Sequence, residues 1–287
     1  GTHLLAIRCS HDHQRRRALD MTTVTQAQAG PKNFAERNPH FGSGALRRRV
    51  RLIARAGVVR CGVEDAYHSF RLSLHHDGQR VTEIRPTFLR VPLSTCPSAD
   101  VPLRGFVGLA LDTPWRTLVA KENPRAHCTH LHDLAMLAMA HAQRGGTRTY
   151  DIAVPDEHPD PVWSTVHRDG VEVLRWRTWR GKILAPTELE GRPLLRGFSA
   201  WANTTFSGDQ LEAALVMHKG YFVSRARSWD VEAGAGLPIA SHEMMRGACH
   251  SYSEPQMARA IRNRGTTIDT SDPATPLLTD LALGDLD

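Results

Sequence analysis

The sequence predicts an α+β fold in which helices cover one face of an antiparallel sheet. The first observation is the order of the patterns along the chain, because strand patterns come first and helix patterns follow them. The second is the pair Asp77-Gly78, a strong hairpin signal that separates two of the strand patterns. That order is typical of helices packed together on one side of an antiparallel sheet.

Strands are predicted where apolar side chains recur at every second position. Residues 67–75 alternate in this way, and His68 shares their apolar face. The partner strand after the hairpin spans residues 80–89, and residues 49–54 show the same alternation. Together these segments predict the sheet of the first half of the chain.

Helices are predicted after the strands. The clearest covers residues 129–143, starts after Cys128 and ends at Gly145-Gly146. Two shorter helices precede it, at residues 97–109 and 114–120.

The later half mixes both patterns, and Arg168-Asp169-Gly170 gives a second hairpin signal. We expect strands there at residues 162–167, 171–179 and 221–229, and helices at residues 193–202, 209–217, 241–249 and 254–263.

These patterns divide the chain into four parts. Residues 1–44 are polar without a sustained period, which predicts a flexible N-terminal segment. Residues 45–155 form a first α+β domain, and a proline-containing linker leads to a second, smaller α+β part at residues 156–267. Residues 268–287 are expected to be a tail.

Composition narrows the class of protein. The net charge of +6 comes mainly from runs of arginine that carry no interleaved aromatic residues, so nucleic-acid binding is not predicted. No apolar run approaches the roughly 18 residues of a membrane span. The five cysteines form no regular framework and no signal-peptide pattern precedes them, which favours a reducing, cytoplasmic setting.

Two cysteines stand at the starts of predicted helices, Cys96 before residues 97–109 and Cys128 before residues 129–143. The positive end of a helix dipole lowers the pKa of a thiol and favours the thiolate, the form that binds metals. The alternative is that both are inert, because free cysteines are often buried as small hydrophobic residues.

Three further residues are candidates for a site. His130 and Asp133 lie one helical turn apart, a spacing that suits a carboxylate orienting an imidazole, with His130 as general acid or base. Glu64 lies four residues before His68, on the same predicted strand face, and is a candidate fourth ligand or base. The alternatives are a surface pair for His130 and Asp133, a solvated Glu64 and a core histidine at His68.

Two resemblances follow from these motifs. The stretches STCPSADVPLRGFVG, HCTHLHDLA and GFSAWA, among others, resemble an uncharacterised bacterial domain-of-unknown-function family over residues 46–263. Residues 62–143 are also similar to the NifU-like iron–sulfur cluster scaffold fold, in which three cysteines, an aspartate and a histidine meet at one tip.

The scaffold resemblance implies a metal site. It places Cys96 and Cys128 on the second and third scaffold cysteines and His68 near the scaffold aspartate, whereas Asp65 or Ala66 stands where the first cysteine is expected. Two thiols and an imidazole still suit one mononuclear zinc or iron ion with an open fourth position. The implied ligands are therefore His68, Cys96 and Cys128.

The sequence thus predicts a metal-dependent enzyme that acts on a small, anionic or neutral organic substrate by lyase, hydrolase or oxygenase chemistry, with the second part covering the site. One alternative is a non-catalytic metal or iron–sulfur cluster carrier. Another is a metal-free enzyme with Cys128 as nucleophile and His130 as base.

Overall fold

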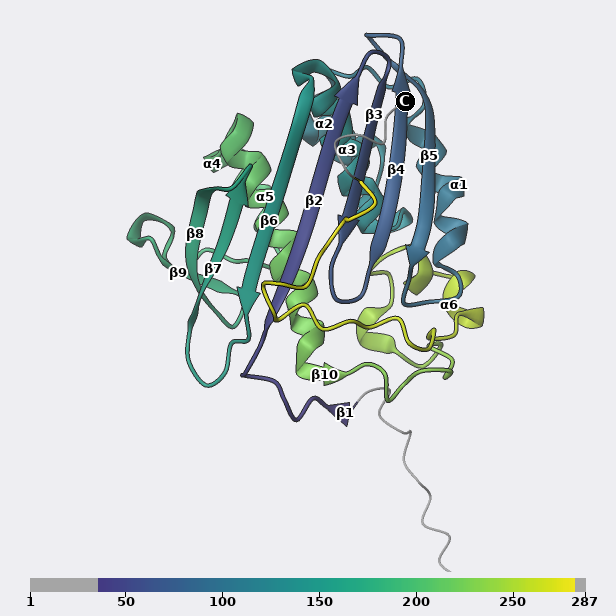
Figure 1. Cartoon of the computed structure of the whole chain (residues 1–287). Helices are drawn as coiled ribbons and strands as arrows, with labels where there is room; N and C mark the ends of the chain where they lie inside the picture. The colour runs from purple at the N-terminus through teal and green to yellow at the C-terminus, as the bar shows by residue number, and fades with distance from the viewer. Residues whose placement is uncertain (1–35, 282–287) are drawn as a thin grey trace, which may run out of the picture. The chain divides into compact units, whose positions relative to one another are not determined.

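Within residues 36–281, the part of the chain that the structure describes, eight strands form one antiparallel sheet in the order β5-β4-β3-β2-β6-β7-β8-β9 (Figure 1). The structure is a computed structural model, and most of the predicted flexible segment lies outside its described residues. The strands are β2 (Ala45–Arg55), β3 (Val58–Glu64), β4 (Ser69–His76), β5 (Val81–Arg90), β6 (Gly146–Pro155), β7 (Val162–Arg168), β8 (Val171–Trp179) and β9 (Lys182–Ala185).

Both predicted parts of the chain contribute to this sheet. The proposed boundary at residue 155 falls between β6 and β7, and these strands pair with each other, with Asp151 opposite His167. β6 also pairs with β2 along its length, with Arg49 opposite Asp151. The second part therefore extends the sheet of the first.

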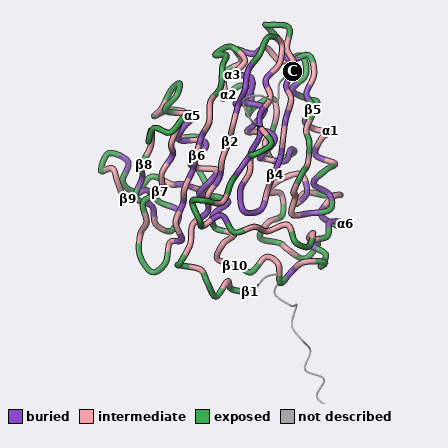
Figure 2. The backbone as a smooth tube through the Cα atoms, viewed as in Figure 1, coloured by how far each residue is buried: buried purple, intermediate pink, exposed green. Residues whose placement is uncertain are grey.

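One face of the sheet, the helix-covered face, carries the long helices. α3 (Thr129–Arg144) packs on β2, β3 and β4, and α5 (Gly208–Ser224) packs on β2, β6, β7 and β8. Gly220 lets α5 approach closely, because a Cβ atom there would lie 2.6 Å from Cγ2 of Ile152. The buried residues between these layers form the main core (Figure 2).

Shorter elements complete the described chain. They are the helices α1 (Asp100–Leu103), α2 (Trp115–Lys121), α4 (Phe198–Thr205) and α6 (Gln256–Arg259), and the small two-stranded pairing of β1 (Glu36–Arg37) with β10 (Trp229–Asp230). No helix among the described residues is long and apolar enough to cross a membrane.

The opposite face, the outer face, is crossed by residues 266–281, which we call the C-terminal segment and which runs in yellow over β2 and β3 in Figure 1. Arg47, Arg49 and Arg51 of β2 donate hydrogen bonds to its backbone carbonyls. Leu278 and Leu281 pack over Gly62, where a Cβ atom would lie 3.1 Å and 2.5 Å from them. Most of the predicted tail is thus an integral layer of the fold.

The α+β prediction is confirmed, with helices packed on an antiparallel sheet, but some elements differ from expectation. Residues 221–229 were predicted as a strand, whereas α5 continues to Ser224 because its apolar side chains pack on the sheet. The predicted helix at residues 97–109 is a series of short helical turns. The predicted helices at residues 241–249 and 254–263 are mostly turns, apart from α6.

Candidate metal centre

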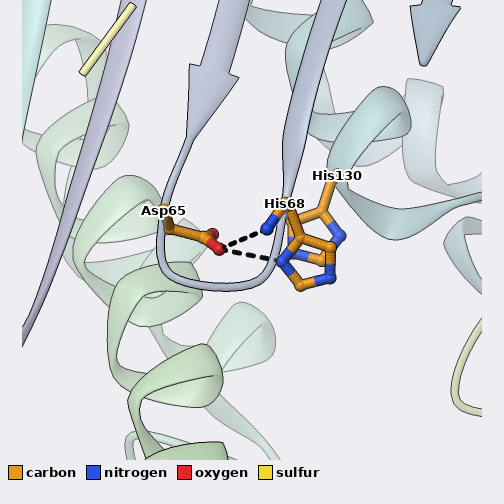
Figure 3. Close-up of side chains that lie close together, drawn as sticks. All are labelled: Asp65, His68 and His130. Carbon is orange, nitrogen blue, oxygen red and sulfur yellow. Dashed lines mark hydrogen bonds and ion pairs between the residues drawn. The ribbon is translucent and has the colours of Figure 1, made fainter. Parts of the chain in front are cut away.

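Asp65, His68 and His130 lie together on the helix-covered face. Asp65 and His68 belong to the tight turn between β3 and β4, and His130 projects from the first turn of α3 (Figure 3). Among the described residues, they form the one set of three His, Cys, Asp or Glu side chains whose potential ligand atoms all lie within 4.8 Å of one another. The set joins two strands to the start of a helix.

The carboxylate of Asp65 is fully buried and held on both oxygens. Oδ1 accepts the backbone N–H groups of Tyr67 and His68, each at 2.9 Å, and lies 3.0 Å from Nδ1 of His68. Oδ2 pairs with the guanidinium of Arg48, from β2. Burial alone would raise the pKa of Asp65, but His68 and Arg48 outweigh it and lower the pKa far below its ordinary value.

Arg90, near the end of β5, fixes the backbone of the same turn. Its guanidinium donates to the carbonyl of Asp65 at 2.6 Å and to that of Ala66 at 2.9 Å. It also donates to the carbonyl of Thr266, at 2.8 Å, in the C-terminal segment. The turn that presents Asp65 and His68 is therefore held in place by a side chain from another strand.

His130 has a buried ring nitrogen that accepts or donates no hydrogen bond. Its Nε2 atom is buried without a hydrogen-bond partner, and Nδ1 lies 4.0 Å from Sγ of Cys128. The ring lies over that of His68, with centroids 4.0 Å apart. Burial, followed by the nearby His68 and Arg48, lowers the pKa of His130 well below 6.5, so the ring is neutral at physiological pH.

Chemically, the group offers one carboxylate oxygen and two imidazole nitrogens. Neutral imidazole and carboxylate suit zinc and iron, and three protein ligands leave a coordination position open. His68 is the most exposed member, with 14% of its side chain accessible, so solvent reaches the group at that ring. The geometry is therefore that of a candidate mononuclear metal centre.

Two of the predicted site residues, His68 and His130, meet in this group, and Asp65 was not predicted as a ligand. The sequence did mark Asp65 as the residue that stands where the scaffold fold has its first cysteine. The usable signal was the spacing of Asp65 and His68 across a strand-to-strand turn.

Cys96 and Cys128 are not members of the group. Both are buried, and burial raises the pKa of Cys96 to about 11 and that of Cys128 to about 12. The helix dipole was expected to lower the pKa of these thiols, but the loss of hydration on burial raises the pKa by more. Sγ of Cys96 accepts a hydrogen bond from Ser251 at 3.6 Å, whereas Cys128 lies beside Nδ1 of His130.

Glu64 and Asp133 also point elsewhere. Glu64 faces the outer side of the sheet, because side chains alternate along β3, and its Oε2 accepts the backbone N–H of Leu278 at 2.8 Å. Asp133 forms an ion pair with Lys219 of α5, with an N–O distance of 3.0 Å. Neither carboxylate orients His130, so the predicted pairing of His130 with Asp133 is corrected.

Comparison with known proteins places this group inside a recognised sequence unit. Residues 49–144, about a third of the chain, match the family described as Protein of unknown function (DUF2889), and all three candidate ligands lie within the match. The chain is also similar to a beta-ketoacyl-(acyl-carrier-protein) synthase III from Kocuria rhizophila, with 29% identity over 115 residues. That similarity covers 36% of this chain and 32% of the synthase, so the chain spans about a third of that relative's length.

Proposed function

We propose that the chain is a metal-dependent enzyme that binds one zinc or iron ion through Asp65, His68 and His130 and acts on a small organic molecule. Two observations support the proposal. Nε2 of His130 is buried without a hydrogen-bond partner, and one ring nitrogen of His130 lies within 4.8 Å of ligand atoms of Asp65 and His68. A buried ring nitrogen without a partner costs free energy, and a metal ion at this point satisfies it.

The proposed chemistry rests on the open coordination position. An ion held by three protein ligands polarises a substrate oxygen or activates water or dioxygen, which fits hydrolase, lyase or oxygenase reactions. His130 takes the role of a ligand here, which replaces the role of general acid or base expected from its spacing to Asp133.

The two alternative functions receive less support. The ligand group contains no thiol, and iron–sulfur clusters are held chiefly by cysteine thiolates. A nucleophilic cysteine needs a lowered pKa, whereas burial raises the pKa of Cys128 to about 12.

The test compares two histidines of the same helix. His130 and His141 both lie in α3, and each has one buried ring nitrogen without a partner, but His141 is paired through Nε2 to the carbonyl of Gly146 at the far end of the helix. In calorimetric titrations with zinc after chelator treatment, we expect wild type and His141→Gln to bind one equivalent. His130→Gln should bind at least about 100-fold more weakly. Equal zinc affinity in His130→Gln and wild type would contradict the proposal.

A further inference from the structure

Arg48 gives the candidate centre an unusual charge balance. Its side chain is 3% exposed, that of Asp65 is fully buried, and the two form an ion pair on the helix-covered face. The guanidinium is always protonated, so it cancels the one negative charge among the three ligands. The two imidazoles bind a metal as neutral rings. A bound divalent ion therefore keeps nearly two uncompensated positive charges.

The neighbouring charged groups do not restore the balance. Lys219 acts electrostatically on His130, but it is paired with Asp133 across α3 and α5. Glu64 lies on the outer face, where Arg90 and Arg71 are its ionic partners. Around the described ligand group, each carboxylate thus already has its own cation.

We propose that the open position of this centre takes an anionic group, a carboxylate of the substrate or a small inorganic anion. The inference rests on the proposed function and adds the substrate class. Net positive charge in a largely buried site is costly, and an anion that enters through the open position compensates it, whereas a neutral ligand does not. Access is at the ring of His68, the most exposed ligand.

Arg48 therefore has opposite effects on metal binding and on anion binding. Its positive charge repels the metal ion and attracts the anion, and Coulomb interactions over a few ångströms in a partly buried site are large. Replacing Arg48 with methionine should therefore strengthen metal binding and weaken anion binding. A purely structural role would weaken both.

The experiment uses the full chain loaded with cobalt(II), whose visible absorption changes when a ligand enters the open position. Azide and acetate serve as anionic probes and imidazole as a neutral probe. We expect wild type to bind azide and acetate, and Arg48→Met to show about tenfold tighter cobalt binding, about tenfold weaker azide binding and unchanged imidazole binding. Arg48→Lys places another cation next to the Asp65 carboxylate and should retain azide binding within about threefold.

Arg227→Met is the matched control, because Arg227 and Asp156 form another ion pair with 11% and 1% exposure, outside the ligand group. It should leave cobalt and azide affinities unchanged. Wild-type cobalt protein that binds neither azide nor acetate would overturn the inference, as would loss of azide binding in Arg48→Lys or parallel weakening of cobalt and azide in Arg48→Met. Failure of wild type to bind cobalt at all would instead contradict the proposed function.

Discussion

Asp65 accepts hydrogen bonds from two backbone amides and is flanked by His68 and Arg48, so its carboxylate has one orientation. His130 completes the group from a different element, with its pKa lowered by burial. These contacts fix the positions of the Asp65 carboxylate and the His130 ring within the fold.

Substitution of the two cysteines tests which side chains are ligands. Cys96→Ser and Cys128→Ser should each keep full zinc binding, because neither thiol belongs to the ligand group, and each should cost about 1 kcal/mol of unfolding free energy. Zinc content by elemental analysis and denaturant unfolding measure the two quantities. Release of zinc by either serine variant would show that the replaced cysteine is a zinc ligand.

At the level of residues, periodicity predicted which face His68 occupies but not how deep each group lies. Strand alternation placed His68 with the apolar side chains of β4, and its ring does lie beside that of Phe70. The start of α3 after Cys128 was also predicted, yet the pKa of Cys128 depends on burial, which tertiary packing decides. Asp65 was missed because its role depends on Arg48, from another strand.

Between elements, Lys219 of α5 and Asp133 of α3 join the two long helices near the candidate centre. Burial alone would raise the pKa of Asp133, but Lys219 and His132 outweigh it and lower the pKa to about 2. Because this pKa is below the unfolded value of 3.8, the pair stabilises the fold above about pH 4. That stabilisation is lost as the pH falls through about 2.

Asp133→Asn should therefore lower the unfolding free energy by about 1 kcal/mol at pH 7, a discounted value because the Asp133 side chain is 35% exposed. Urea unfolding at pH 7, 4 and 2 measures the effect. The difference from wild type should shrink between pH 4 and 2. A difference that stays constant with pH would show that the ion pair does not contribute.

Helices and strands were predicted correctly where one hydrophobic period dominated a long segment. The prediction failed where tertiary contacts determine the secondary structure. The hairpin around Asp77-Gly78 and the helix at residues 129–143 were found. Tyr221 and Val223 favour strands and so predict a strand at the end of α5, but Tyr221 is buried and its hydroxyl donates to Glu157 at 2.8 Å. Such a contact is not visible in a local pattern.

For the whole molecule, the packing of the C-terminal segment on the sheet is the feature that local sequence patterns predict least. It lacks a helix or strand period, and its place depends on arginines of β2 and on the missing side chain of Gly62. Through Thr266 and Arg90 it also contacts the turn that presents Asp65. The segment thus links the outer layer of the fold to the candidate centre.

Leu278 tests whether this segment is a structural layer. Its side chain is 1% exposed, so Leu278→Ala should lower the unfolding free energy by about 2–4 kcal/mol in urea denaturation. Leu237→Ala, at a leucine that is 41% exposed, should change it by less than about 0.5 kcal/mol. Equal small effects would mean that the segment behaves as the tail that the sequence predicted.

The central claim, a metal centre built from Asp65, His68 and His130, is tested most directly by metal stoichiometry. Protein purified without a histidine tag and without chelator should contain close to one equivalent of zinc or iron per chain by elemental analysis, and the variant His68→Gln/His130→Gln should contain almost none. Less than about a tenth of an equivalent of any transition metal in wild type, with no uptake of added zinc, would contradict the claim.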